Sequence, residues 1–115
     1  MYANKKVLIT GASSGLGKSL AVAYAKQKAK IINLSRSVNK MTLLNNELNN
    51  INKLNNKFFS VDVSKYNEIL EIKNALQREN NLPDIIINNA AGNFLCPFEK
   101  LTLNGWKRIN DIVLN

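Results

Sequence analysis

The chain of 115 residues is 45% hydrophobic, which gives one compact domain a core and excludes intrinsic disorder. With one cysteine (Cys96), no histidine and no apolar run of roughly 20 residues, we expect no disulfide, no metal site and no membrane contact in an intracellular protein. The net charge of +8 comes from lysines scattered along the chain, which argues against a nucleic-acid-binding protein. Two explanations of the charge remain open: a composition biased toward lysine and asparagine, or attraction of a phosphate-bearing small molecule.

Short apolar runs alternate with segments whose apolar residues recur every three or four positions. The runs predict buried strands at Lys6–Thr10, Lys30–Ser35, Lys57–Val61 and Asp84–Asn88. The segments between them predict three helices, whose repeating residues are Leu16, Leu20, Ala23 and Tyr24, then Met41, Leu44, Leu48 and Ile51, then Ile69, Ile72 and Leu76. A fourth helix is predicted from a cap at Thr102 through Trp106 to Val113.

This alternation is typical of an α/β protein with a parallel sheet covered by helices on both faces. If the chain reverses direction after the third strand, the strand order is 3-2-1-4. We therefore predict a Rossmann-type doubly wound sheet of about four strands and four helices, with ligands at the carboxyl ends of strands one and four. Residues 1–115 are expected to form the N-terminal, dinucleotide-binding part of a single domain of this kind.

The turn after the first strand carries a glycine motif, Thr10-Gly11-Ala12-Ser13-Ser14-Gly15-Leu16-Gly17. Gly11 permits a sharp turn, Gly15 lets the backbone approach a pyrophosphate, and Gly17 lets the helix pack closely on the sheet. Free backbone N–H groups and the helix dipole would then hold the phosphate, with the Ser13 and Ser14 hydroxyls as further donors. A plain strand-to-helix turn is the alternative. The Gly-x3-Gly-x-Gly spacing resembles the short-chain dehydrogenase/reductase family, which implies an oxidoreductase that uses a nicotinamide dinucleotide.

The end of the second strand predicts which dinucleotide is used. An NAD site usually has Asp or Glu here to hold the ribose hydroxyls, but this chain has Ser35 followed by Arg36. Because arginine can bind a 2′-phosphate through paired hydrogen bonds, we predict NADP(H), with Ser37 and Lys40 as helpers. Many NADP-using relatives carry a basic residue where this chain has Ser14, and an ordinary exposed loop arginine is the alternative for Arg36.

The ends of the third and fourth strands extend the resemblance. Asp62 matches the aspartate that holds the adenine amine in this family, and Val63 matches the residue that supplies backbone contacts. Helix capping by Ser64, with Asp62 merely nearby, is the alternative, and the two roles are compatible. The segment Asn88-Asn89-Ala90-Ala91-Gly92 is similar to the family's Asn-Asn-Ala-Gly motif, with one extra alanine. The match implies that Asn89, Ala90, Ala91 and Gly92 lie against the cofactor and that Asn89 ties the central sheet together.

The stretch from Asn88 to Phe94, followed by Pro97, Trp106 and Asp111–Asn115, resembles the 2,4-dienoyl-CoA reductases. Those enzymes use NADPH to reduce a conjugated dienoyl-CoA in the breakdown of unsaturated fatty acids. The resemblance implies an acyl-CoA substrate near Asn93 and Phe94, a catalytic role for Asn115 in a proton relay, and a homo-oligomer at full length. Hydrophobic loop packing is the alternative for Phe94, and a simple terminal residue is the alternative for Asn115.

In this family the Tyr-x3-Lys proton donor comes later in the chain than the fourth-strand motif, and residues 89–115 contain no tyrosine; Tyr2 and Tyr24, which have a lysine four positions on, lie in the first part of the chain. We therefore expect the N-terminal part of a longer reductase, inactive alone, whose apolar fourth strand would be an open sheet edge. A carbonyl or 3-oxoacyl reductase of the same family and a non-catalytic NADP-binding protein are the competing functions. The compartment is cytoplasmic by default, with peroxisome and mitochondrion left open, since a peroxisomal signal would lie at a later C-terminus.

Overall fold

The computed structural model describes residues 2–12, 15–89 and 107–110, the last four as backbone only. Its elements are β1 (Lys6–Thr10), α1 (Gly15–Lys26), β2 (Lys30–Ser35), α2 (Val38–Ile51), β3 (Lys57–Ser60), α3 (Tyr66–Arg78), β4 (Ile85–Asn88) and β5 (Lys107–Asn110). The four strands and three helices expected up to Asn88 are confirmed, with ends that differ by one residue at β3 and β4. No helix in the described part of the chain is both long and apolar enough to cross a membrane.

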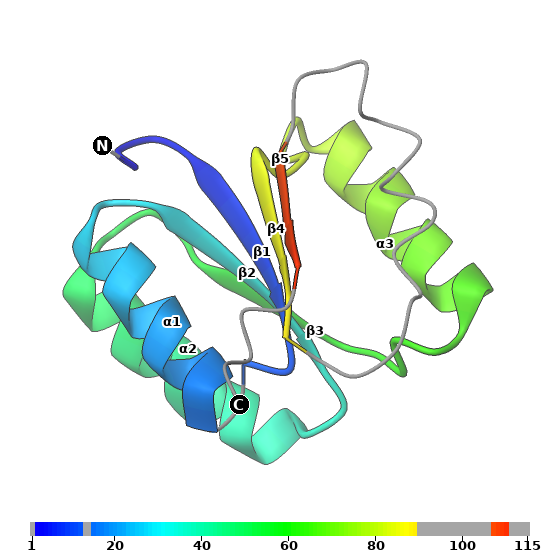
Figure 1. The fold of residues 1–115 in the computed structure, drawn as a ribbon, viewed down its shortest axis with the longest axis horizontal. Helices are drawn as coiled ribbons and strands as arrows, with labels where there is room; N and C mark the ends of the chain where they lie inside the picture. Colours follow the sequence, from blue (N-terminus) through cyan, green and yellow to red (C-terminus); the bar gives the residue numbers. More distant parts are fainter. Residues whose placement is uncertain (1, 13–14, 90–106, 111–115) are drawn as a thin grey trace.

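The strands form one parallel sheet in the order β3-β2-β1-β4-β5, which contains the expected order 3-2-1-4. The helices α1 and α2 cover one face of this sheet and α3 covers the other (Figure 1). The chain therefore winds in one direction through β2 and β3, then returns past β1 to β4. This reversal lies between β1 and β4, where doubly wound folds place their ligands.

Both faces of the central strands are buried, because successive residues of a strand point to opposite faces. On the α1–α2 face, Val7 and Ile9 of β1 pack in one core with Leu48 of α2. On the α3 face, Leu8 of β1 packs in a second core with Leu76 of α3. The continuous apolar runs of the sequence are thus the result of burial on two sides.

The helix α1 lies against the sheet through its smallest residues. Its buried positions are Gly17, Ala21 and Ala25, spaced one helical turn apart, whereas Leu16 is 39% exposed. Small side chains on the inner face let the helix axis approach the strands closely. The helical period in the sequence therefore identified the helix but not its buried face: of the four residues that gave the period, Leu16 and Ala23 are exposed, and Leu20 and Tyr24 are partly buried at the edge of the core.

The predicted fourth helix, from Thr102 to Val113, is wrong for the part of it that the structure describes. Residues Lys107–Asn110 form β5, which pairs in parallel with β4 from Ile85↔Lys107 to Asn88↔Asn110. As a consequence β4 is not the sheet edge that the sequence led us to expect. The physical reason is that the outer side of an apolar strand presents unpaired N–H and C=O groups, and a neighbouring strand satisfies them. The remaining residues of the predicted helix lie outside the described ranges.

Hydrogen bonds from asparagine side chains stabilise the edge of the sheet at which the strands begin. Asn56 is 2% exposed, and its Oδ1 accepts a hydrogen bond from the backbone N–H of Ile31 at 2.7 Å. Its Nδ2 donates to the side-chain oxygens of Asn49 (2.8 Å) and Asn52 (2.9 Å). The Asn52 Nδ2 in turn donates to the carbonyl of Ala25 at the end of α1 (3.0 Å). Part of the asparagine-rich stretch therefore holds α1, β2 and α2 together.

Candidate functional site

The predicted site residues of the described chain gather where parallel strands end. Thr10 closes β1, Arg36 follows β2, Asp62 lies two residues after β3, and Asn89 follows β4. The register of the sheet brings these strand ends to one edge, because Thr10 pairs with Leu34 on one side and with Asn88 on the other. The sequence predicted a ligand site at the carboxyl ends of strands one and four, and the structure brings the ends of β2 and β3 to the same edge.

The turn between β1 and α1 has the backbone conformation that its glycines suggested. Gly11 has φ 71° and Gly15 has φ 61°, both in the left-handed region that favours glycine. The Gly11 N–H donates to the carbonyl of Leu34 at 2.9 Å, which fixes the start of the turn to β2. At Gly15, where α1 begins, a Cβ would meet no atom of the described residues within 4 Å. Ser13 and Ser14 lie outside the described residues.

Gly17 is where α1 comes closest to the turn. A Cβ built there would collide with the carbonyl oxygen of Gly11 and lie 2.6 Å from Nδ2 of Asn89 and 2.9 Å from Cα of Ala12. No side chain fits at this position without moving the helix. The geometry agrees with the packing role that the sequence assigned to this glycine.

A hydrogen-bonded chain ties the glycine turn to the end of β4. The Thr10 hydroxyl donates to Oδ1 of Asn88 at 3.2 Å and accepts from the backbone N–H of Asn89 at 3.1 Å. The Asn89 Nδ2 donates to the carbonyl of Gly11 at 3.2 Å. The turn is thereby anchored to both neighbouring strands. The buried Oδ1 of Asn89 has no hydrogen-bond partner in the part of the chain that the structure describes.

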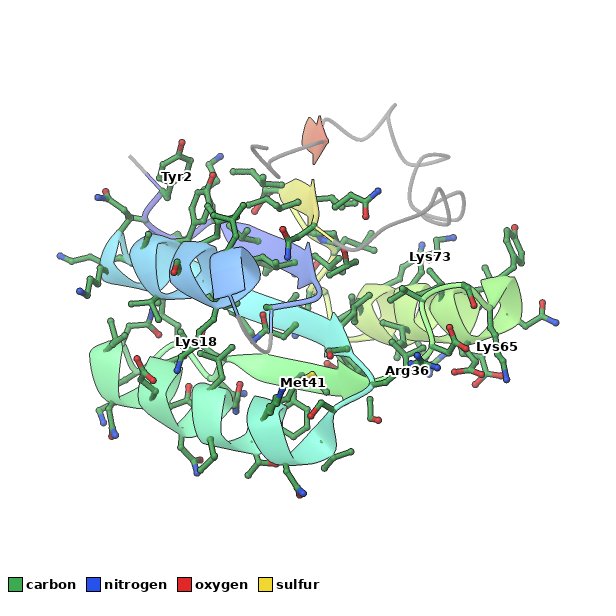
Figure 2. The ribbon with its side chains drawn as sticks, turned by 60° about the horizontal axis from the view of Figure 1, so that its bottom comes forward. Tyr2, Lys18, Arg36, Met41, Lys65 and Lys73 are labelled. Atoms are coloured by element: carbon green, nitrogen blue, oxygen red, sulfur yellow. The ribbon has the colours of Figure 1, made fainter. Side chains whose placement is uncertain are left out.

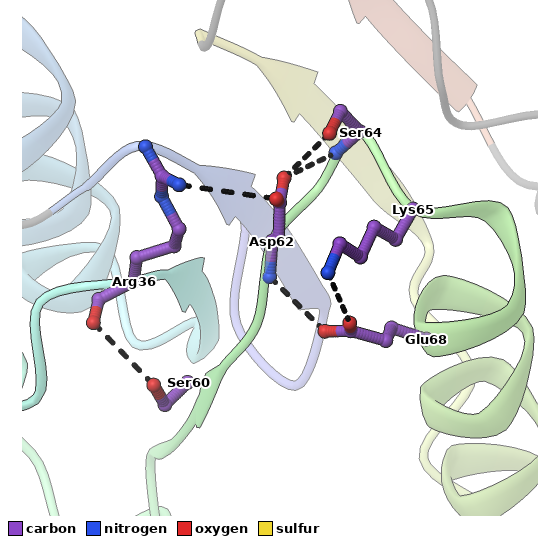
Figure 3. A network of polar contacts seen from close by, with 6 residues as sticks. All are labelled: Arg36, Ser60, Asp62, Ser64, Lys65 and Glu68. Atoms are coloured by element: carbon purple, nitrogen blue, oxygen red, sulfur yellow. Dashed lines mark hydrogen bonds and ion pairs between the residues drawn. The ribbon is translucent and has the colours of Figure 1, made fainter.

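A second polar network lies at the ends of β2 and β3 (Figure 3). The Arg36 guanidinium forms an ion pair with the Asp62 carboxylate, with Nη1 and Oδ2 3.8 Å apart. The arginine side chain is 79% exposed and the aspartate 27%. The backbone of the same loop is held by Ser60, whose hydroxyl donates to the Arg36 carbonyl at 3.4 Å. Arg36 thus presents a positive charge at the strand ends from an anchored backbone.

Asp62 is held by the residues that follow it. Its Oδ1 accepts from the backbone N–H (3.0 Å) and the hydroxyl (2.6 Å) of Ser64, and its own N–H donates to Oε1 of Glu68 at 3.3 Å. The Ser64 hydrogen bonds, assisted by the charges of Arg36 and Lys65, hold the pKa of the Asp62 carboxyl below its usual range. The group is therefore a carboxylate at neutral pH.

Ser64 does not cap α3. The N-cap of that helix is Lys65, whose side chain makes no capping hydrogen bond, so the capping alternative is wrong. Sequence reasoning missed Glu68, which reaches back from the first turn of α3 to the Asp62 N–H and also pairs with Lys65 at 3.8 Å. A glutamate at the third helical position often contacts the loop before the helix, so a signal for Glu68 was present.

The other predicted residues divide into those near the site and those not described. Ser37 is the N-cap of α2 without a side-chain capping bond, and its N–H donates to the Ser35 hydroxyl at 3.4 Å. Lys40 is exposed, and Val63 packs against the core beneath α3. The predicted residues outside the described ranges are Ala90, Ala91, Gly92, Asn93, Phe94 and Asn115.

The described side chains contain no group of three or more His, Cys, Asp or Glu that could hold a metal ion. The positive charge at the strand ends comes from Arg36, with Lys65 at the same end of the molecule (Figure 2). Donors and charge of this kind suit an anion rather than a cation.

Comparisons with known proteins point to one family. A family model described as short chain dehydrogenase matches residues 5–115. The chain is 39% identical over 112 residues to a probable 2,4-dienoyl-CoA reductase of Bacillus subtilis (strain 168), which covers 96% of this chain and 43% of that protein. It is 38% identical over 90 residues to an NADPH-dependent pterin aldehyde reductase of Arabidopsis thaliana, which covers 78% of this chain and 36% of that protein.

A solved structure has a similar fold. The L-sorbose reductase of Gluconobacter frateurii, determined with NADPH and L-sorbose, has a TM-score of 0.72 and 27% sequence identity, covering 78% of this chain and 34% of that one. The chain spans less than half the length of each of these three proteins. Because the family model matches nearly every residue and the fold has the same arrangement, this chain belongs to the short chain dehydrogenase family.

Proposed function

We propose that this chain is the dinucleotide-binding part of an NADP(H)-dependent reductase. The observation that carries the proposal is Arg36, an exposed arginine at the end of β2, on the same sheet edge as the glycine turn. An NAD site usually has a carboxylate at this point of β2, whereas an arginine can hold a 2′-phosphate with charge-assisted hydrogen bonds.

The residues present fit a dinucleotide. None of the described atoms crowds Gly15 at the N-terminal end of α1, where backbone N–H groups and the helix dipole favour an anion such as a pyrophosphate. The Oδ1 of Asn89, which has no hydrogen-bond partner among the described residues, is an acceptor at the strand end beside this turn. Arg36 would hold the 2′-phosphate and Asp62 the adenine amine, with Val63 supplying backbone contacts. Within the turn, Thr10 and Asn89 keep Gly11 in place.

The proposed substrate class is an acyl-CoA thioester with conjugated double bonds. This rests on the resemblance of residues 88–94 and 111–115 to 2,4-dienoyl-CoA reductases and on the 39% identity to a protein of that name. When bound, the nicotinamide would supply a hydride to the conjugated system, and the protein would orient the two reactants and stabilise the developing charge. Asn93 and Phe94 are proposed to contact the substrate, and Asn115 to hold a water for proton transfer. As part of a longer chain, residues 1–115 alone are proposed to be inactive.

A carbonyl reductase is the second candidate, favoured by the 38% identity to an aldehyde reductase. A 3-oxoacyl reductase of the same family belongs to this candidate, because it also reduces a carbonyl group. A protein that binds NADP without catalysis is the third. For any of these we propose a homo-oligomer in an intracellular compartment, cytoplasmic, peroxisomal or mitochondrial.

The deciding experiment measures NADPH oxidation by the protein in its natural length, with a 2,4-dienoyl-CoA, a 3-oxoacyl-CoA and a simple aldehyde as substrates. We expect turnover of the dienoyl-CoA, with NADPH preferred over NADH. Turnover of carbonyl substrates alone would replace the first candidate by the second. Tight NADPH binding without any turnover would favour the binding protein.

A further inference from the structure

The Arg36–Asp62 ion pair joins the two groups to which the proposed function assigns different parts of the nucleotide. Their atoms are 3.8 Å apart, which is longer than the roughly 2.7–3.2 Å of a hydrogen bond to nitrogen. The contact is therefore Coulombic, and it leaves the N–H donors of the guanidinium available. A second anion at the same place could replace Asp62 as the partner of Arg36 without the loss of a hydrogen bond.

The two partners differ in how firmly they are held. Asp62 is fixed by two hydrogen bonds from Ser64, whereas the Arg36 side chain is 79% exposed beyond its anchored backbone. Figure 3 shows the arginine reaching across from the β2 side toward the carboxylate. Among the charged side chains that the structure describes, Arg36 is the cation in ion-pair contact with Asp62, while Lys65 pairs with Glu68.

We propose that Asp62 takes the anion position beside Arg36 in the nucleotide-free protein and thereby lowers the preference of the site for a 2′-phosphate. This inference rests on the proposed function, in which Arg36 binds that phosphate. When a 2′-phosphate arrives, Arg36 turns from the carboxylate to the phosphate, and the Asp62 charge then lies beside a dianion. Both effects weaken binding of a 2′-phosphorylated nucleotide and leave a nucleotide without that phosphate unaffected.

Asp62 is thus a specificity-determining residue as well as the proposed adenine contact. Its low carboxyl pKa keeps the competing charge present at neutral pH. The hydrogen bonds from Ser64 keep the carboxylate in place, so it does not withdraw when a phosphate approaches. The selectivity of the site is then a difference between the attraction of Arg36 and the repulsion of Asp62.

The test compares 2′,5′-ADP with 5′-AMP, which differ only in the 2′-phosphate. Dissociation constants are measured by calorimetry on the protein in its natural length, and the selectivity is the constant for 5′-AMP divided by that for 2′,5′-ADP. Asp62→Asn keeps the shape and the hydrogen-bond acceptor but removes the charge. Any loss of adenine binding weakens both ligands equally and cancels in this ratio.

We expect the selectivity of Asp62→Asn to rise about three- to ten-fold over the unmodified protein, because an exposed ion pair and a screened repulsion are both removed. Glu79→Gln is the matched control, since it removes one carboxylate at the opposite end of the sheet, where Glu79 pairs with Lys57 at 2.6 Å. The control should change the selectivity by less than about two-fold, because salt screens a charge that lies about a Debye length or more from Arg36.

An unchanged or lower selectivity in Asp62→Asn would overturn the inference. Asp62→Ala, checked for cooperative melting, provides a second measurement if the asparagine variant does not fold. Arg36→Ala separates this failure from that of the proposed function. If Arg36→Ala leaves the selectivity unchanged, Arg36 is not the 2′-phosphate ligand and the proposed function fails. If Arg36→Ala removes the selectivity while the Asp62 variants leave it unchanged, the proposed function stands and only the competition between Asp62 and the 2′-phosphate for Arg36 is wrong.

Discussion

Replacing Gly17 by alanine tests how closely α1 lies on the glycine turn. Alanine favours a helix by about 1 kcal/mol over glycine, so an uncrowded position would be stabilised. Here the new Cβ would collide with the Gly11 carbonyl and lie 2.9 Å from Cα of Ala12. Normal carbon contacts are about 3.5–4.0 Å, so α1 would have to move outward by several tenths of an ångström or more.

The size of the effect follows from these opposing contributions. Overpacking costs about 1–3 kcal/mol, and backbone atoms cannot rotate away as a side chain can. The cost should therefore lie in the upper part of this range, about 2–3 kcal/mol, and after subtraction of the helix-propensity gain of about 1 kcal/mol we expect Gly17→Ala to lose about 1–2 kcal/mol in net stability. Dinucleotide binding should weaken as well, because the displaced helix carries the N–H groups of the turn.

The assay is chemical unfolding of the natural-length protein, with nucleotide binding measured on the same samples. Ala23→Gly, at an exposed position of α1, is the control, and it should cost about 1 kcal/mol from helix propensity alone. A Gly17→Ala variant as stable as the unmodified protein, or more stable, would refute the close packing of α1 on the turn.

Three further predictions concern the rest of the fold. Asn33 is fully buried in β2, and neither polar atom of its side chain has a hydrogen-bond partner among the described residues. Asn33→Val should therefore raise the unfolding free energy by about 1–3 kcal/mol. A lower melting temperature of this variant would contradict the prediction. Asn56→Ala should lower the unfolding free energy by about 2–4 kcal/mol in denaturant unfolding, because it leaves the buried Ile31 N–H without its acceptor. The control Asn46→Ala, at an exposed position of α2, should change it by less than about 0.5 kcal/mol. Hydrogen bonds from Lys57 and Asn81 hold the pKa of Glu79 below its usual value, so its stabilisation is present above about pH 4.3 and is lost as the pH falls through the folded pKa. Melting temperatures below pH 5 should then fall less steeply in Glu79→Gln, and an identical slope would count against the Lys57–Glu79 pair.

The strands and the glycine turn could be predicted because their signals are local. A run such as Ile85–Ile87 is apolar throughout since it is covered on both faces, and Gly11 and Gly15 mark positive φ angles at a strand-to-helix turn. Strand order followed from the limited ways in which parallel strands can be connected.

The features that were missed depend on distant contacts. Residues Lys107–Asn110 form β5 because β4 offers them a pairing edge, which no pattern within those four residues encodes. The Arg36–Asp62 ion pair and the hydrogen bond from Ile31 to Asn56 likewise join residues 26 and 25 positions apart, so their geometry depends on the folded sheet. Asn33 in a central strand went unnoticed because the surrounding residues of β2 gave a clear strand signal.

The measurement that tests the central claim most directly is the affinity of the natural-length protein for NADPH and for NADH, before and after Arg36→Ala. Charge-assisted hydrogen bonds of about 1.5–3 kcal/mol predict that NADPH binds roughly ten-fold or more tightly than NADH. Arg36→Ala should remove this advantage and leave the NADH affinity unchanged. Equal binding of the two dinucleotides, or tighter binding of NADH, by the unmodified protein would contradict the account.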